Sequence, residues 1–576
     1  MRAFRVSNLP GLRAFMCITL MPVPALAVVN IGPTCGETSI QHAIDTYTEE
    51  TDFYVDVGTY AENLYLNSPF ETRYLRILGG HINCSDQVLD DPTATVLTGA
   101  GSNQSVIAIT GAINAYIGGL TITGGSAPVG GGIFFNGTGG LALVDARITA
   151  NAAQSGGGIG VVPHKGPVDV GLLRNTLISG NTASTAGGGV YVSGDASFRV
   201  GMSSAIAYNT VSGASGVGGG LAIVGSARAD IASQGFFDPL FNLTYGAIAY
   251  NKATFGAGAR ASDGAVVRVY SVEEGRPTVI ENNGDLDGPH ETLYGGGIEA
   301  TSGAKVCGWG YTFSNNRAGA GAAIRSYGAQ VQLSRDAIFD ACGSPSSPPL
   351  YLAECAPGDT CNRFQLNVGE SDIINTSSGV GFPSVFQADR VEMSQNTVLA
   401  AGLIDSYNDS SLTNCLITGN LTRYVVIWRQ QLSLDGCTIA GNQSEDPQFD
   451  TRIFTADPSL PGGLTLSRSI VWQPEAIMVQ NTLSSVTVND VITSDAAALS
   501  GGIHSGITQT DPLFMDAANA DYRLRPASPA VDYAITGPLA TDIAGQARGV
   551  QIRSGAHPHD VGAYELQDPI FANGFQ

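Results

Sequence analysis

The side chains that could carry out chemistry are few, and one grouping stands out. Asp389 is followed directly by Arg390, and Asp405 and Asp409 come about one repeat later. A lyase that acts on uronates needs a basic residue to remove the proton next to a carboxylate, and it commonly uses Ca²⁺ to stabilise the enolate. These four residues are the nearest candidates for catalysis, although exposed charges are more often solvated surface groups.

A second grouping resembles half of a calcium-binding loop. Residues 283–288 read Asn-Gly-Asp-Leu-Asp-Gly and follow the first half of the pattern D-x-[DN]-x-[DN]-G. Such a loop wants a bidentate acid at its twelfth position, where this chain has Tyr294, although an acid at the ninth position could substitute. Two interpretations stay open: an Asx-rich turn that binds no metal, or a Ca²⁺ site with the ligands Asn283, Asp285, Asp287 and Glu291.

Other potentially reactive residues have a structural interpretation. Asp336 occupies a repeat position that small residues fill elsewhere, so we expect either a buried acid or a hydrogen-bonded structural aspartate. His557 and His559 precede Asp560, and we expect core or turn histidines there rather than metal ligands. The motifs G-H-G, R-x-K, G-x-S-x-G and H-E-x-x-H are absent, as is a phosphate-binding G-K-[ST] step.

The composition limits the classes of protein to which the chain can belong. It has 74 Gly and 27 Pro among 576 residues, which argues against a helical core. The 50 acidic residues outnumber the 28 Lys and Arg, and the formal net charge of -22 makes nucleic acid an unsuitable partner. Because 43% of the residues are hydrophobic, wholesale disorder is excluded and the chain must bury a large core.

A nine-residue pattern, L-x-[polar or Gly]-small-x-I-x-small-N, recurs without gaps at residues 143–151, 173–181, 412–420 and 434–442. Weaker copies bring the total to about 14 units. Each unit contains short β-rich pieces separated by Gly and Asn and has no room for an amphipathic helix. The repeat therefore predicts one turn of a β-solenoid per unit, with Leu and Ile stacked inside and Asn and Gly at positions of positive φ.

Glycine triplets form a second series, with G-G-G-I at residues 130–133, 156–159 and 295–298 and close variants between 187 and 322. Together with the segment Phe313-Ser-Asn-Asn316, this series resembles the polymorphic membrane-protein repeat, whose copies carry a G-G-[A/G]-I and an F-x-x-N motif. The resemblance covers roughly residues 115–330. It implies an all-β fold, a right-handed parallel β-helix of the pectin lyase-like superfamily.

Four short motifs lie near the C-terminus, at residues 511–514, 521–524, 528–532 and 560–565. They are similar to the choice-of-anchor Q domain, which ends many exported bacterial β-helix proteins. The segment that follows contains Ile570-Phe-Ala-Asn-Gly-Phe575 and resembles short terminal tails of exported proteins. A sorting signal and a frayed end both remain open for this tail.

The N-terminus has the features of a signal peptide. Arginines precede an apolar run, and Ala25-Leu26-Ala27 fits signal-peptidase cleavage, so we expect removal of residues 1–27 and no transmembrane helix in the mature chain. Eight cysteines then remain, an even number that favours disulfides in an exported protein.

The cysteine spacing suggests some of the pairs. Cys35 and Cys84 bracket an N-terminal cap and would tie it down. Cys415 and Cys437 occupy equivalent positions of adjacent coils, where they form either a bridge or a buried thiol stack. Three pairings are possible for the other four, with the last two as the local pair: Cys307, Cys342, Cys355 and Cys361.

The expected organisation is a signal peptide (1–27), an N-terminal cap with a helix starting near Ile40 (28–95), the parallel β-helix (96–499), anchor-like coils and a cap (500–565), and a tail (566–576). Coils lengthen near residues 232–250, 281–295, 341–365 and 443–463. The first of these insertions carries aromatic side chains that suit sugar stacking but could equally cover apolar coils: Phe236, Phe237, Phe241 and Tyr245.

These observations together predict an exported bacterial protein of the cell surface or the medium. We expect a non-catalytic, adhesin-like rod that contacts a polysaccharide, a cell-surface glycan or another surface protein. The alternative is a polysaccharide lyase or glycoside hydrolase on the same scaffold, since parallel β-helices include such enzymes. Apart from Ca²⁺, the sequence indicates no cofactor.

Overall fold

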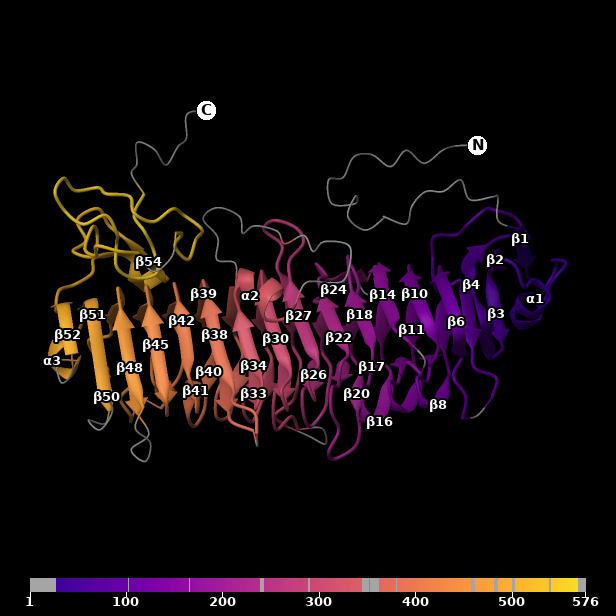
Figure 1. Cartoon of the computed structure of the whole chain (residues 1–576), viewed down its shortest axis with the longest axis horizontal. Helices are drawn as coiled ribbons and strands as arrows, with labels where there is room; N and C mark the ends of the chain where they lie inside the picture. The colour runs from indigo at the N-terminus through magenta and orange to yellow at the C-terminus, as the bar shows by residue number, and fades with distance from the viewer. Residues whose placement is uncertain are drawn as a thin grey trace.

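The computed structural model describes residues 27–567, with gaps at 102, 165, 239–242, 288–290, 344–351, 353–361, 380, 447, 457–461, 481–484, 500–502 and 538–539. The described residues form a long rod of stacked strands (Figure 1). The fold is a right-handed parallel β-helix, which confirms the predicted fold class. The expected signal peptide up to residue 26, the tail from residue 568, Phe241, Cys355 and Cys361 lie outside the described residues.

Each coil contributes one strand to each of three faces, and strands of successive coils pair in parallel. Face 1 contains β9 (Ile133–Phe135), β13 (Ile159–Val161), β17 (Val190–Ser193), β21 (Leu221–Val224), β26 (Ala259–Ser262), β29 (Ile298–Thr301), β33 (Ile324–Tyr327), β37 (Ile374–Ser377), β41 (Gly402–Ser406), β44 (Tyr424–Trp428), β47 (Arg452–Ala456) and β50 (Ile477–Gln480).

Face 2 contains β1 (Ala27–Ile31), β2 (Thr51–Asp56), β10 (Thr138–Val144), β14 (Val168–Arg174), β18 (Ala196–Val200), β22 (Arg228–Ile231), β27 (Val266–Tyr270), β30 (Lys305–Trp309), β34 (Gln330–Leu333), β38 (Val385–Asp389), β42 (Ser410–Thr413), β45 (Gln431–Asp435) and β48 (Gly463–Ser467). Four long strands turn a corner or end the stack: β4 (Leu64–His81), β6 (Ile107–Gly118), β51 (Ser485–Thr493) and β52 (Ile503–Thr508).

Face 3 contains β3 (Gly58–Ala61), β5 (Thr95–Thr98), β7 (Thr121–Thr123), β11 (Arg147–Thr149), β15 (Leu177–Ser179), β19 (Ala205–Ala207), β25 (Ile248–Ala249), β28 (Thr278–Glu281), β31 (Tyr311–Ser314), β35 (Asn362–Gln365), β39 (Val391–Ser394), β43 (Leu416–Thr418), β46 (Thr438–Ala440) and β49 (Ile470–Trp472).

Short strands and helices complete the described elements. Two small parallel sheets lie between faces 3 and 1: β8 (Ser126–Val129), β12 (Ala152–Ser155), β16 (Thr182–Ala186) and β20 (Thr210–Val211), and then β32 (Arg317–Ala318), β36 (Val368–Gly369) and β40 (Thr397–Val398). Two antiparallel hairpins are β23 (Phe236–Asp238) with β24 (Leu243–Tyr245), and β53 (Phe514–Asp516) with β54 (Asp521–Leu524). The helices are α1 (Ile40–Thr46), α2 (Arg335–Asp340), α3 (Ala496–Leu499) and the 3₁₀ turn η2 (Ala517–Asn519).

The repeated asparagine forms a buried ladder inside the turn between faces 3 and 1. The Oδ1 atom of Asn181 accepts hydrogen bonds from the backbone N–H and the Nδ2 of Asn151, at 3.1 and 3.0 Å. The same pair of bonds continues coil by coil through Asn209, Asn251, Asn283, Asn316, Asn367, Asn396, Asn420 and Asn442. A buried side-chain amide satisfies a backbone donor at every step, and in the next coil Oε1 of Gln473 takes over this role by accepting from the N–H of Asn442 at 3.2 Å.

The expectation that these asparagines adopt positive φ is wrong. Positive φ belongs to the residue before each ladder asparagine, for example Gly180, Tyr208 and Gln395. The asparagine recurs because of its side-chain hydrogen bonds, and the sharp turn is made one residue earlier.

Each position of the glycine triplet has a steric reason. Gly156 has a φ of 69°, which glycine adopts without the Cβ penalty. A Cβ on Gly157 would overlap the carbonyl oxygens of Gly188 and Thr182, and one on Gly158 would lie 2.7 Å from the oxygen of Gly189. The triplets therefore allow successive coils to approach closely.

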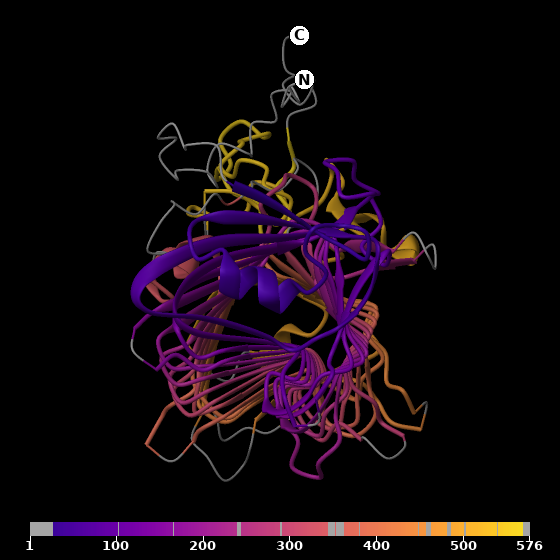
Figure 2. The same ribbon diagram turned by 90° about the vertical axis from the view of Figure 1, so that its right-hand side faces the viewer.

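The N-terminal end of the rod is closed by α1, which lies across the opening (Figure 2). Ser39 caps this helix by accepting a hydrogen bond from the N–H of His42, and Ile40, Ala43 and Ile44 are buried. The predicted disulfide between Cys35 and Cys84 is present, with a Cα–Cα distance of 5.4 Å.

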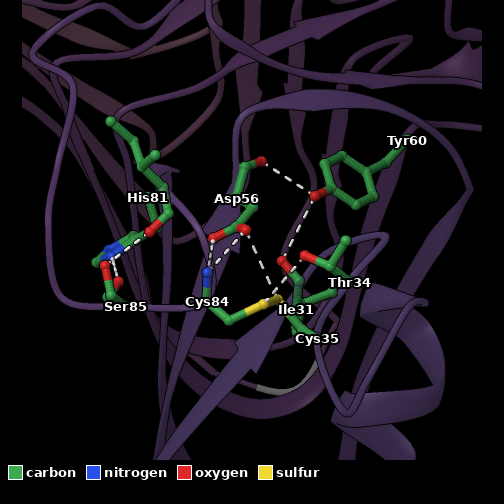
Figure 3. Close-up of a disulfide and its surroundings, with 9 residues drawn as sticks. Ile31, Thr34, Cys35, Asp56, Tyr60, His81, Cys84 and Ser85 are labelled. Carbon is green, nitrogen blue, oxygen red and sulfur yellow. Dashed lines mark hydrogen bonds between the residues drawn. A yellow bond between two sulfur atoms is a disulfide. The ribbon is translucent and has the colours of Figure 1, made fainter.

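Asp56 lies against this disulfide and accepts hydrogen bonds from the N–H of Cys84 at 3.1 and 2.9 Å (Figure 3). Cys35, Asp56 and Cys84 form a compact group of atoms that could ligate a metal. Both sulfurs are bonded to each other, so in this state they offer no thiolate, and the group serves to hold the cap.

Two further disulfides connect described cysteines. Cys415 and Cys437 form a bridge between adjacent coils rather than a thiol stack, with Cα atoms 4.4 Å apart. Cys307 pairs with Cys342, which follows α2. Among the described residues, no helix is both long and apolar enough to cross a membrane.

The C-terminal segment from β53 onward lies on the side of the rod, whereas the sequence led us to expect coils and an end cap there (Figure 1). It covers apolar side chains that point outward from face 3, including Leu416, Ala440 and Ile470. Arg548 donates to the Oδ1 of Asn414 at 2.9 Å, which ties the segment to the rod. The stack itself ends at β52 and α3, where Leu499 closes the core.

Candidate functional site

A row of charged and amide side chains follows the outer surface of face 1. The strand register pairs Arg260 with Glu299, Glu299 with Arg325, Arg325 with Asn375, and Asn375 with Asp405. Paired strands lie about 4.8 Å apart. We call these five residues the charged row; it crosses five coils and runs along the axis of the rod.

The acids of the row hold its arginines in place. Glu299 is 1% exposed and ion-pairs with Arg325 at 2.7 Å and with Arg260 at 3.3 Å. Asp405 is paired with Arg429, which follows β44. The acids lie beneath the guanidinium groups, so they orient the arginines and neutralise part of their charge.

Aromatic rings flank the same arginines. The guanidinium of Arg325 lies 3.5 Å from the ring centre of Tyr294, and that of Arg429 lies 3.5 Å from Tyr407. Stacking of this kind and a buried acid together remove most of the rotational freedom of an arginine. The guanidinium planes are therefore preorganised.

An arginine–aromatic cluster lies beyond the C-terminal end of the charged row, at the start of β44 and β47, three residues before the register position of the row. Arg423 lies 3.9 Å from the ring centre of Phe449, and Nη1 of Arg452 donates to the Tyr424 hydroxyl at 2.9 Å. Seven of the nine arginine–ring contacts among the described residues involve Arg260, Arg325, Arg423, Arg429 or Arg452. This concentration distinguishes face 1 from the other faces.

Asp372 lies beside the charged row, in the turn before β37. It is 1% exposed, and its carboxylate accepts hydrogen bonds from the N–H of Gly321 at 2.5 Å and from Nδ2 of Asn375 at 2.8 Å. Burial raises its pKa and the charge of Asp405 adds to the rise, while the hydrogen bonds and Arg325 oppose it, and together these effects raise the pKa to about 7. Asp372 therefore changes charge near neutral pH.

We predict that the rod is more stable at pH 5.5 than at pH 8. A carboxyl whose pKa is raised on folding stabilises the folded state at low pH, and this contribution is lost between its unfolded and folded pKa values, here 3.8 and about 7. For Asp372 the free energy of unfolding should fall by about 2 kcal/mol between pH 5.5 and pH 8. Asp389 and Asp560, with pKa values raised by burial to about 6 and about 7, act in the same direction.

The measurement is urea unfolding at the two pH values, for the native chain and for Asp372→Asn. The variant cannot ionise at this position, so its loss of stability toward pH 8 should be smaller by about 2 kcal/mol. Equal pH dependence in the two proteins would contradict the assignment.

The structure separates the residues that the sequence grouped as a catalytic candidate. Asp405 is part of the charged row on face 1. Asp389 and Arg390 lie at the corner between faces 2 and 3, where the guanidinium of Arg390 stacks 4.4 Å from Trp309. Asp409 is exposed, and its Oδ1 accepts a hydrogen bond from the N–H of Gln431.

Asp336 does not occupy a coil position. It is exposed in the first turn of α2, which Ser334 caps by accepting a hydrogen bond from the N–H of Ala337 at 3.3 Å. The repeat alignment fails here because a helix interrupts the coil.

The calcium candidates do not converge on one point. The Asn283 amide belongs to the asparagine ladder, and Asp285 pairs with Lys252 at 2.8 Å. Asp285 also accepts a hydrogen bond from the N–H of Asp287, which is an Asx turn. Asp287 and Glu291 are exposed, and no metal-type cluster other than that of Cys35, Asp56 and Cys84 occurs in the part of the chain that the structure describes.

The aromatic candidates divide into buried and exposed rings. Phe236 and Tyr245 are 2% and 5% exposed and cover apolar residues of face 3, whereas Phe237 is 53% exposed. In the C-terminal segment, Asp560 accepts hydrogen bonds from the N–H groups of Asp532 and Leu566, which fits a structural acid.

Sequence reasoning missed most of the charged row, although a signal was present. Arg260, Glu299 and Arg325 each directly follow a glycine-rich motif, at the position where earlier coils carry Tyr191 and Ala222. Comparing this one position across successive repeats would have predicted that Arg260, Glu299 and Arg325 lie next to one another.

Comparison with known proteins adds little. No protein-family model and no curated protein matches the sequence. Among solved structures, the chain is similar to the rice weevil pectin methyl esterase, with 13% identity and a TM-score of 0.23 over 50% of this chain and 92% of that one. The likeness is weak and says nothing about function.

Proposed function

We propose that this protein is an exported, non-catalytic, adhesin-like rod that binds an anionic glycan along the outer surface of face 1. The observation that carries the proposal is the set of arginines held over aromatic rings in nearby coils. The planar fork of arginine fits carboxylate and sulfate groups in two-point hydrogen bonds, and aromatic rings suit the apolar faces of sugars. The three disulfides fit an oxidising compartment outside the cytoplasm.

Burial determines which groups a ligand would meet. Glu299 and Asp372 are each 1% exposed, whereas Tyr327 and Tyr407 are each 39% exposed. The side chains of Arg260 and Arg325 keep 26% and 16% of their surface in solvent. The surface of the row is therefore guanidinium and phenol, with the acids underneath.

The direction of the row suggests a polymeric ligand. Because the row crosses the strands, a bound chain would lie parallel to the rod and contact several coils at once. Successive arginines would then meet successive anionic groups of a linear polysaccharide.

A polysaccharide lyase or hydrolase on the same scaffold is the second candidate. It is favoured by Asp372, whose pKa of about 7 suits a general acid or base. However, Asp372 is buried and bonded to Gly321 and Asn375, and Asp405 is paired with Arg429, so both acids hold the row. Incubation with polyuronates should give no product, and product that disappears in Asp405→Asn would establish the enzyme instead.

Replacing either Arg325 or Arg429 by glutamine should weaken binding to a soluble polyuronate by about 10- to 100-fold, because a charge-assisted hydrogen bond contributes about 1.5–3 kcal/mol. Affinity gel electrophoresis at low and high salt measures the effect, and the native affinity should fall as salt screens the arginines.

Two further variants and a control distinguish a loss of binding from a loss of folding. Arg452→Gln and Tyr327→Ala alter the binding surface without removing either arginine partner of Glu299, and each should weaken binding. Arg523→Gln breaks an exposed ion pair with Asp521 in the C-terminal segment and should bind normally. Native affinity in all the face 1 variants would refute the proposal.

A further inference from the structure

A second aromatic surface lies on face 3, away from the charged row. Tyr208 follows β19 and Tyr250 follows β25, and their rings are stacked in parallel at 4.7 Å with an interplanar angle of 6°. Tyr245 of the β23–β24 hairpin meets Tyr208 edge-on at 5.5 Å. Tyr208, Tyr250 and Phe237 are 43%, 36% and 53% exposed.

The hairpin beside these tyrosines is firmly attached. Asp238 pairs with Arg147 at 3.3 Å, and the Arg147 guanidinium lies 5.4 Å from the ring of Phe236. Phe236 and Tyr245 pack on Leu177, Ala205 and Ala249. The exposed rings are therefore presented on a rigid base.

A carboxylate accompanies the tyrosines. Glu281, at the end of β28 in the next coil, accepts a hydrogen bond from the N–H of Gly246 at 2.7 Å. Its charge raises the pKa of both Tyr208 and Tyr250, although burial of the two phenols is the larger cause. A carboxylate therefore lies close to the two exposed phenols.

The two tyrosines also occupy demanding backbone positions. Both have positive φ, 57° for Tyr208 and 56° for Tyr250, at a position that other coils fill with glycine, as at Gly180 and Gly419, but also with Ala150, Leu366 and Gln395. A bulky side chain is disfavoured in this conformation. Two adjacent coils therefore carry aromatic residues where glycine would fold more easily.

We propose that Tyr208 and Tyr250 form a second binding surface, specific for an uncharged glycan. Aromatic rings stack on the apolar face of a pyranose, and the phenols and Glu281 can hydrogen-bond its hydroxyls. The carboxylate disfavours anionic polymers, so this surface and the charged row select ligands of different charge. If the charged row also binds as proposed, one rod holds two different glycans on two faces.

The test uses the native chain and the double variant Tyr208→Asn with Tyr250→Asn, because asparagine tolerates positive φ. Affinity gel electrophoresis with a soluble β-glucan, a mannan and a dextran should show retardation of the native chain by at least one of them. The double variant should bind that glycan about tenfold more weakly, given the loss of two stacking rings. Its binding to polyuronate should equal that of the native chain.

Additional variants separate this proposal from its rivals. Phe237→Ser, on the side of the hairpin opposite Phe236 and Tyr245, and Tyr327→Ala on face 1 should both leave neutral-glycan binding unchanged. Failure of all three neutral glycans to bind the native chain, or equal binding by the double variant, would overturn the proposal. So would a native dimer, detected by light scattering, that the double variant converts to a monomer, since the patch would then be a protein interface.

Discussion

Replacing Asn316 by alanine is expected to lower the free energy of unfolding by about 3–6 kcal/mol. Asn316 is fully buried, and its Oδ1 accepts hydrogen bonds from the backbone N–H and Nδ2 of Asn283, both at 3.1 Å. Its own Nδ2 donates to the carbonyl of Ile280 and to Oδ1 of Asn367. Alanine would leave two buried donors without an acceptor, each costing about 1–3 kcal/mol, and would add a cavity.

The measurement is equilibrium unfolding in urea, with Asn519→Ala as the control. Asn519 is exposed and donates only to Asp516, so its replacement should change stability by less than about 0.5 kcal/mol. Asn316→Asp provides a second check, because the acid is nearly isosteric but buries a charge at pH 7. It should be less damaging at pH 5, and equal stability of Asn316→Ala and the native chain would contradict the structural role of the ladder.

Gly157→Ala is expected to destabilise the rod by about 3 kcal/mol or more. The new Cβ would overlap the carbonyl oxygens of Gly188 and Thr182, both of which are backbone atoms of the following coil. A flexible side chain could move aside, but a coil paired on both sides cannot, so the strain falls on the strand pairing.

Gly36→Ala is the matched control for this substitution. Gly36 has no atom within 4 Å of an added Cβ and no positive φ, so alanine should be neutral or slightly stabilising there. Thermal unfolding of the two variants compares them directly. A Gly157→Ala protein as stable as Gly36→Ala would show that the coils are not as closely stacked as described.

The fold could be predicted from the sequence because its rules repeat in every coil. Ile148, Ile178, Ile417 and Ile439 fill the same buried position, and the ladder asparagine satisfies the same backbone donor each time. The backbone imposes these two requirements on every coil. The residues that meet them therefore recur at fixed positions of each repeat and can be recognised in the sequence alone.

The charged row was harder to predict because the outward positions obey no common rule. Arg325 and Asp405 become close neighbours of Asn375 only through the strand register, with an insertion of uneven length between β34 and β35. Asp372 belongs to a turn, where the sequence gives no periodic signal. The grouping of Asp389 with Asp405 failed for the same reason. The two residues are close in the sequence, but they belong to strands on different faces of the rod.

The position of the C-terminal segment depends on which coils expose apolar residues. Outward positions of face 3 are polar at Thr312 and Glu392 but apolar at Leu416 and Ile470, where the segment docks. Its motifs identify the segment in the sequence, but its docking site is determined by residues about a hundred positions earlier in the chain.

A crystal structure of the protein with a bound uronate oligosaccharide tests the central claim most directly. We expect a sugar chain along the outside of face 1, with its carboxylates bonded to Arg325 and Arg429 and its rings beside Tyr327 and Tyr407. A ligand that lies elsewhere on the rod, or one that contacts face 1 without these arginines, would contradict it.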